Sequence, residues 1–175
     1  SVTNEVKAML DPSHVPEPAV EGSRFGAKDV SDLTWKNLMD AYTCTECGRC
    51  TSSGPANITG NLLSPRKSMM DTRDRLTEVG NNIDLHGEDY VDGKSLLDNY
   101  ISREEIWACT TCNACTEACP INIDPLAIIV ELRRFAVMEE ASVPTSLNNM
   151  FGNIENNGAP WKYAPLDRLN WAKTS

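Results

Sequence analysis

Hydrophobic residues recur at helical spacing through the middle of the chain. The first stripe lies between residues 32 and 43, where apolar side chains follow the i, i+3, i+4, i+7 pattern. Its members are Trp35, Leu38, Met39 and Tyr42. Ser31 or Asp32 can cap the N-terminus of such a helix. We therefore predict a helix over 32–43 that buries this stripe in the core and delivers the chain to Cys44.

A second helix is indicated downstream of the first stripe. Ser64 suits its N-cap, Pro65 suits its first position, and Gly80 suits its end. The pattern predicts a helix over 65–79. Residues 80–94 are polar and rich in glycine, and we expect them to form a loop.

Three more helices follow. Ser102 and Glu105 form a capping box for a short helix that ends at Cys109. A segment over about 124–140 is apolar on more than one face, which is typical of a central buried helix. An apolar stripe predicts a last helix over 145–156, again as part of the core. Because no strand or hairpin signal is present, we predict an all-α fold.

The N-terminal residues differ from the rest in composition. Residues 1–30 include three prolines within "DPSHVPEPAVEG" and have no apolar period, so they are expected to form an extended tail or linker. The remaining residues, 31–175, are expected to form one domain. The chain begins with Ser1 rather than Met, which indicates a fragment or a processed form.

The charge of the chain excludes some functions. Its 175 residues carry a net charge of −9, and a nucleic-acid-binding surface needs clustered Lys and Arg instead. The segment from Asp71 to Glu105 contains ten Asp or Glu and four Lys or Arg. This acidic window is either a solvated surface or a docking face for a basic partner. No apolar run approaches the roughly 20 residues that cross a bilayer, and no signal peptide is present, so we expect a soluble chain.

The seven cysteines are confined to two blocks that repeat each other. "CTECGRCTSSGP" covers 44–55 and "CTTCNACTEACP" covers 109–120; they align without a gap and share three Cys, two Thr and a Pro. One cysteine has no counterpart, because Cys119 aligns with Gly54. Clustered cysteines of odd number, without an export signal, indicate metal binding rather than disulfides.

The spacing of the cysteines favours iron–sulfur clusters. Three cysteines at steps of three, followed by a fourth before Pro, are typical of cluster ligands, and thiolates suit iron–sulfide clusters. Zinc sites more often use C-x2-C pairs with a long spacer, often with His, and a thiol-redox role is a further alternative. His14 and His86 lie outside both blocks.

The ligands can be assigned to two clusters in two ways. In two-cluster ferredoxins the fourth cysteine of a block binds the other cluster, which gives one complete site and one site that lacks a ligand. The complete site would use Cys44, Cys47, Cys50 and Cys119, and the incomplete one Cys109, Cys112 and Cys115. If each block kept its own fourth ligand instead, the first block would be deficient.

Several outcomes are open for the incomplete site. A 3Fe-4S cluster needs three thiolates and is our first expectation. A 4Fe-4S cluster could keep an iron bound by water, by a small thiol or by an oxygen of Ser52 or Ser53. A partner chain could also supply the ligand. Otherwise Gly54 is a peculiar substitution that makes the site labile.

The two blocks, with "LSPRKSMMDTRDRLTEVG", "IIVELRRFAVMEE" and "NIENNGAPW", resemble bacterial proteins related to heterodisulfide reductase iron–sulfur proteins. The resemblance covers about residues 30–172. It implies an α-helical ferredoxin-like domain with two iron–sulfur clusters that passes electrons to redox protein subunits, including a cysteine-rich partner. It also implies a membrane anchor N-terminal to this segment and a place at the cytoplasmic face of the inner membrane. Where the family has Cys, this chain has Gly54.

Three functions follow from these observations. The first is a relay of single electrons from a membrane, flavin or quinone-side donor, with potentials tuned by nearby groups such as Thr and Gly. The second is an enzyme with an open iron site acting on a small molecule. Its available polar groups would be Glu46, Arg49, Asn113 and Glu117. The third is a structural module in which metal only staples helices.

Overall fold

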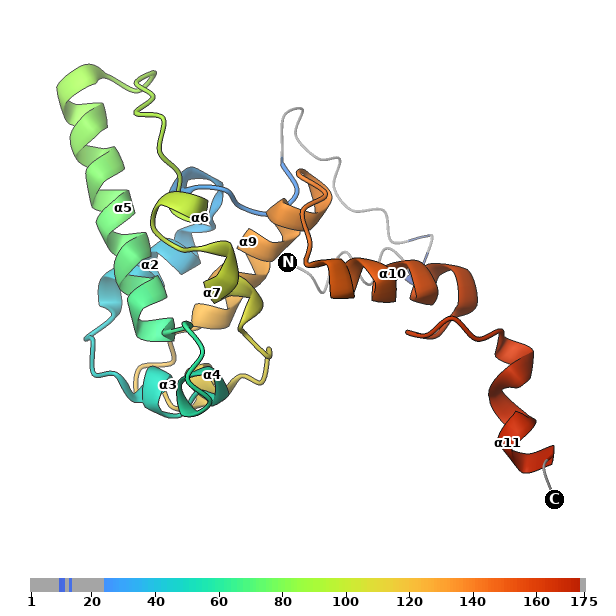
Figure 1. Cartoon of the computed structure of the whole chain (residues 1–175). Coiled ribbons are helices and arrows are strands. Elements are labelled where there is room, and N and C mark those ends of the chain that lie inside the picture. The colour runs from blue at the N-terminus through green and yellow to red at the C-terminus, as the bar shows by residue number, and fades with distance from the viewer. Residues whose placement is uncertain (1–9, 12, 14–23, 174–175) are drawn as a thin grey trace. The chain divides into compact units, whose positions relative to one another are not determined.

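A computed structural model describes residues 10, 11, 13 and 24–173 and divides the chain into two compact units (Figure 1). The first unit ends at Phe135 and the second begins at Ala136, where the sequence had predicted one domain over 31–175. The described residues contain helices and no strand beyond an isolated bridge between Leu97 and Ile101. The prediction of an all-α fold is therefore confirmed.

The helices are mostly short, apart from three. Before α9 the chain forms η1 (Val30–Asp32), α2 (Trp35–Thr43), α3 (Arg49–Ser52), α4 (Pro55–Ile58), α5 (Pro65–His86), α6 (Leu96–Asn99), α7 (Arg103–Trp107) and α8 (Ala114–Glu117). Then follow α9 (Pro125–Met138), α10 (Thr145–Asn157), η2 (Pro165–Leu169) and α11 (Asn170–Lys173). No helix of the described residues is both long enough and apolar enough to cross a membrane.

The core of the first unit forms around α9, as its apolar sequence predicts. Ile128, Ile129 and Leu132 of this helix are buried. Side chains from α5, α6 and α7 are buried as well, among them Met69, Leu96, Leu97 and Ile106. The apolar faces of several short helices are thus covered together, which none of them could achieve alone.

The starts of the predicted helices are mostly correct, but one end is wrong. Ser64 caps α5 by accepting a hydrogen bond from the Lys67 N–H, as predicted. The helix passes through Gly80 and ends at Gly87, which has the positive φ of 93° that ends a helix easily. Because Gly80 has open space around it, its only cost is the lower helix propensity of glycine, about 1 kcal/mol.

The first apolar stripe lies on the wrong face for the predicted core. Trp35, Met39 and Tyr42 of α2 are 75%, 50% and 54% exposed. The buried face carries Asn37 and Asp40 with Ala41, and the Asp40 carboxylate accepts the N–H of Asp124 at 3.2 Å. The helix also begins at Trp35 rather than residue 32, because Thr34 caps it.

The stripe predicted for the last helix is not part of the core either, since α10 contains no buried residue.

The last residues of the predicted tail are packed against α9. Ala27 and Val30 are buried, and the Ala27 N–H donates to the Glu131 carbonyl at 3.0 Å. Gly26 makes this approach possible: its φ is +78°, and a Cβ there would lie 2.4 Å from the Glu131 carbonyl oxygen. The packed structure therefore begins before the expected boundary at residue 30. Residues 1–9, 12 and 14–23 of the predicted tail lie outside the described residues.

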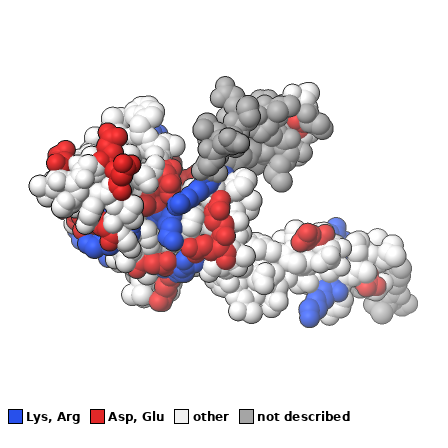
Figure 2. Space-filling model, turned by 90° about the horizontal axis from the view of Figure 1, so that it is seen from above, with Lys and Arg blue, Asp and Glu red and all other residues white. Residues whose placement is uncertain are grey.

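The acidic window forms ion pairs within the unit. Six of its ten carboxylates are paired: Asp71, Asp74, Glu78, Asp92, Asp98 and Glu105. At the centre of this network Arg75, 3% exposed, binds Asp29 at 2.6 Å and Asp92 at 2.5 Å. Figure 2 shows Lys and Arg next to Asp and Glu on the surface. Much of the window is thus internally neutralised rather than a uniform docking face.

Candidate iron–sulfur centres

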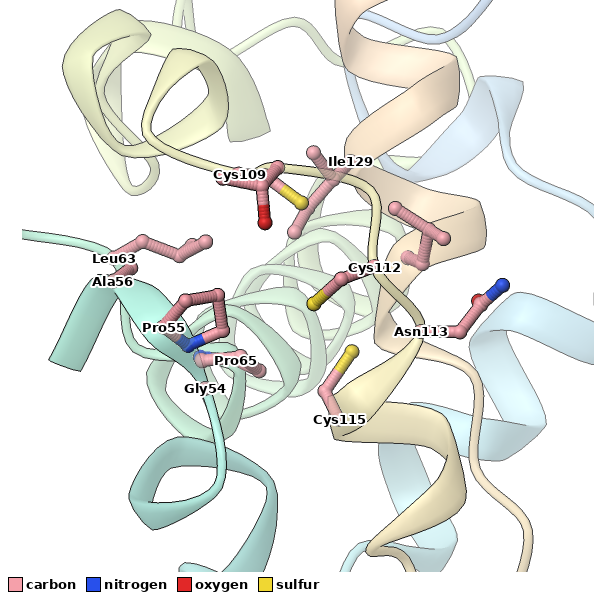
Figure 3. Close-up of a pocket in the computed structure, with 12 residues that line it drawn as sticks. Gly54, Pro55, Ala56, Leu63, Pro65, Cys109, Cys112, Asn113, Cys115 and Ile129 are labelled. Atoms are coloured by element: carbon pink, nitrogen blue, oxygen red, sulfur yellow. The ribbon is translucent and has the colours of Figure 1, made fainter. Parts of the chain in front are cut away.

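The seven cysteines line two separate cavities. The first cavity is lined by Cys44, Cys47, Cys50 and Cys119. The second is lined by Cys109, Cys112 and Cys115, and Gly54 lies in its opposite wall. Figure 3 shows the three sulfur atoms of the second cavity turned toward its interior, with Gly54 across from them. Cys119 of the second block therefore lies beside the cysteines of the first block, and Gly54 of the first block lies beside those of the second.

The two blocks share a backbone path as well as a sequence. Glu46 and Thr111 occupy matched positions, and both have positive φ, 58° and 55°. The same holds for Gly48 and Asn113, at 78° and 61°. A left-handed residue costs roughly 1 kcal/mol when it is not glycine, so these turns are maintained against local strain. They bend each loop around its cavity, and each loop then enters a four-residue helix, α3 or α8.

The thiol groups differ in exposure and in hydrogen bonding. Cys47 and Cys112 are exposed, whereas Cys115 is buried. Burial raises the pKa of the Cys50 and Cys115 thiols. The backbone N–H of Ala114 instead lowers the pKa of Cys112. These differences belong to the free thiols, and bound metal would hold all of them as thiolates.

Backbone N–H groups also reach two of the sulfur atoms. The Thr111 N–H donates to Cys109 Sγ at 3.4 Å, and the Ile123 N–H donates to Cys119 Sγ at 3.3 Å. Of the threonines near the cysteines, Thr116 has its hydroxyl 3.9 Å from Cys115 Sγ. Burial raises the pKa of the Cys50 thiol against the lowering effect of the Thr51 hydroxyl, which also bonds the Ser64 hydroxyl at 3.0 Å. Such donors stabilise negative charge on sulfur.

Comparison with known proteins identifies the domain that contains these cavities. Residues 43–123 match the family model of the 4Fe-4S dicluster domain. This chain carries a 4Fe-4S dicluster domain. A probable iron–sulfur-binding oxidoreductase, FadF of Bacillus subtilis, is 32% identical over 178 residues, which cover 84% of this chain and 25% of that protein.

Two further relatives extend the comparison. An EtfAB:quinone oxidoreductase of Syntrophomonas wolfei is 32% identical over 170 residues, covering 86% of this chain and 24% of that protein. One component of a CoB-CoM heterodisulfide reductase of Methanosarcina acetivorans is 34% identical over 107 residues, covering 61% of this chain and 52% of that component. The predicted relationship to heterodisulfide reductase proteins is confirmed. The chain spans about a quarter of the length of the first two relatives.

The residues of the dicluster domain fit iron–sulfur clusters at both cavities. Thiols converge on each cavity from a loop and from short helices, and thiolates are the preferred ligands of iron–sulfide clusters. No three His, Cys, Asp or Glu among residues 10, 11, 13 and 24–173 are grouped to hold a single metal ion. His14 lies outside the described residues, and His86 stacks on Tyr90 at the end of α5.

The wall of the second cavity opposite the three cysteines is the place for a fourth ligand. Among the described residues, this wall offers no side chain that could bind iron. Gly54 is buried, and Pro55, Ala56, Leu63 and Pro65 form the wall beside it. Neither Ser52 nor Ser53 lines the cavity, and the Ser52 hydroxyl donates to the Arg49 carbonyl at 3.1 Å. The two serines that were candidates for an oxygen ligand are therefore not brought to this site.

The polar residues considered for catalysis are dispersed. Glu46 lines the first cavity and pairs with Arg73 at 2.7 Å, while Arg49 and Glu117 line neither cavity. Asn113 borders the second cavity but points its amide away from the sulfur atoms (Figure 3).

The structure adds residues that the sequence does not mark as part of the site. Arg66 and Met69 of α5 line the first cavity, and Leu126 and Ile129 of α9 line the second. Arg133 of α9 binds the carbonyl oxygen of Cys109. No spacing rule connects these positions to the cysteines, because they lie on α5 and α9, outside both blocks.

Proposed function

We propose that this dicluster domain relays single electrons between a membrane, flavin or quinone-side donor and a redox partner subunit. The observation that carries the proposal is that Cys119 shares a cavity with Cys44, Cys47 and Cys50, while Gly54 faces the other three cysteines. Ligands exchanged in this way would tie both clusters to the same packed helices. An electron relay requires clusters held close together in a rigid frame.

The cysteines of the first cavity, Cys44, Cys47, Cys50 and Cys119, would hold a 4Fe-4S cluster. At the second cavity Cys109, Cys112 and Cys115 would hold a 3Fe-4S cluster or an incompletely ligated 4Fe-4S cluster. The apolar wall around Gly54 favours three irons, because a water on a fourth iron would need polar partners that this wall lacks among the described residues. When bound, such clusters supply reversible one-electron redox chemistry.

The residues around the second cavity support a relay rather than an enzyme. A reaction at an open iron would use acid or base groups and substrate-binding groups close by. The cavity lining contains no Asp, Glu, His, Lys or Arg among the described residues. An apolar surround suits an electron carrier, because it restricts the access of solvent to the cluster.

The names of the relatives support the choice of partners. One is called a probable membrane-anchored ferredoxin, from Chromohalobacter salexigens, and is 32% identical over 165 residues. Others are components of heterodisulfide reductases. For this chain we propose redox protein subunits as partners, a cysteine-rich one among them. We also propose an anchor N-terminal to this segment and a place at the cytoplasmic face of the inner membrane.

The relay is tested on anaerobically purified protein by iron and sulfide analysis with EPR at several applied potentials. We expect about seven irons per chain, four and three, and two signals that appear and disappear reversibly with one electron each. Zinc in place of iron, or clusters that do not change redox state reversibly, would overturn the relay. Eight irons would overturn only the three-iron assignment.

The ligand exchange is tested by Cys47→Ala. If Cys119 completes the site of the first cavity, Cys47 is a ligand of the four-iron cluster, and this variant loses the four-iron signal and keeps the three-iron signal. Thr45→Ala, on the same loop but without a ligand sulfur, is the matched control and should keep both. Loss of the three-iron signal in Cys47→Ala would instead assign Cys119 to its own block, because the first block would then hold the three-iron cluster.

A further inference from the structure

Arg133 anchors its guanidinium group at the start of the second cysteine loop. Its Nε and Nη2 donate to the Ile106 carbonyl at 2.9 and 2.6 Å, and Nη2 also donates to the Cys109 carbonyl. The guanidinium carbon lies 5.0 Å from the centre of the Trp107 ring, within cation–π distance. The charged group is thus fixed against α7 and against the backbone of the first cysteine of the second site.

The charge of Arg133 is not neutralised by a carboxylate of the described residues. Within residues 24–173, its polar contacts are the two backbone carbonyls. Burial lowers the pKa of its half-buried guanidinium, and the Cys109 thiolate is the charged group that opposes this shift. Arginine keeps its proton at any ordinary pH, so the group remains a cation.

The neighbouring Arg134 differs in this respect. It pairs with the Glu131 carboxylate one turn earlier on α9, at 3.1 Å. Two adjacent arginines of the same helix therefore present different charge environments. One is balanced by a carboxylate, and the other binds the backbone of the first cysteine of the second site.

We infer that Arg133 is a positioning residue whose positive charge raises the reduction potential of the cluster held by Cys109, Cys112 and Cys115. The inference rests on the proposed function, since it requires a cluster at the second cavity. Adding an electron to a cluster adds one negative charge, and a fixed nearby cation stabilises the reduced form. A half-buried cation without a carboxylate is costly by itself, and an anionic cluster beside it would offset that cost.

The test compares midpoint potentials of the purified protein, titrated anaerobically with dithionite and monitored by EPR. In Arg133→Gln we expect the reduction equilibrium of the second cluster to fall about tenfold, which is about 59 mV for one electron. The first cluster should shift much less. Arg133→Lys keeps the charge and should retain most of the potential, and Arg134→Gln should leave both potentials unchanged.

The outcomes separate the charge of Arg133 from its structural contacts. An unchanged potential in Arg133→Gln overturns the inference and leaves the relay intact. A potential that falls as far in Arg133→Lys as in Arg133→Gln also overturns it, because the hydrogen bonds would then matter and the charge would not. If Arg133→Gln fails to retain the second cluster, the same variants are compared with Gly54→Cys added, whose extra thiolate strengthens ligation. A wild-type protein without a second cluster overturns both proposals.

Discussion

Introducing a thiolate at position 54 is the most direct perturbation of the second cavity. Gly54 has φ −80° and ψ 134°, an extended conformation that any residue adopts. A Cβ built there would meet the carbonyl oxygens of Cys50 and Thr51, each at 3.4 Å, which is ordinary contact. The residue is buried in the wall opposite the three cysteines. Gly54→Cys should therefore fit without moving the backbone and should direct sulfur toward the cavity.

The expected magnitude follows from this geometry. The iron content should rise from about seven to about eight per chain, and the oxidised three-iron EPR signal should disappear. The backbone itself should contribute little to stability. Replacing glycine where the conformation is compatible stabilises by about 0.4–1 kcal/mol, but Gly54 is also the N-cap of α4, where Ala is less favourable than Gly.

Gly54→Ala is the matched control, because it adds the Cβ without the sulfur. Iron, sulfide and EPR are measured on both variants after the same anaerobic reconstitution. If Gly54→Cys keeps the oxidised three-iron signal, a thiolate at position 54 does not reach the place of the missing fourth iron, and the reasoning fails. If Gly54→Ala produces the same change as Gly54→Cys, the effect comes from packing and not from ligation.

Three further outcomes are expected. Gly26→Ala should destabilise the first unit by more than about 1 kcal/mol in urea unfolding, because its φ is +78° and its Cβ would clash with α9; an unchanged midpoint would contradict this. Arg75→Met should lower the free energy of unfolding by about 3–5 kcal/mol, since it leaves two carboxylates without their partner, and an effect below about 1 kcal/mol would exclude a structural role for the network. Arg75 lowers the pKa of Asp92 to about 2, so this carboxylate stabilises the fold above its unfolded pKa near 4, and that contribution is lost as pH falls toward 2. Acid titration of stability should show the loss in the wild type and much less of it in Arg75→Met.

The helices could be predicted from local signals, but not the side that each helix buries. Ser64 and Ser102 are capping residues whose partners lie three residues away, so their roles are visible in sequence. The stripe of α2 is equally regular, yet the opposite face is buried because Asp40 binds the backbone of Asp124. That contact joins residues 84 positions apart, and no local pattern contains it.

The candidate site was predictable to a similar extent. The cysteines and the position of Gly54 follow from the repeat, because ligand spacing is a local property. Arg133 lies 24 residues beyond Cys109 on α9. The apolar pattern of this helix predicts only that the helix is buried in the core. Its role depends on how α9 packs against the second loop. Groups that tune a cluster from a neighbouring helix carry no sequence signal of their own.

Each cavity has an arginine beside it, but the two arginines are held in different ways. Arg66 lines the first cavity itself, whereas Arg133 is not among the residues that line the second cavity and instead binds the carbonyl oxygen of Cys109. A loss of the thiolate at position 54 does not by itself make a three-iron site less negative, because the missing iron takes positive charge with it. Reduction costs less where a cation lies near the cluster. At the second cavity this contribution therefore comes from Arg133, through the backbone that carries the first cysteine.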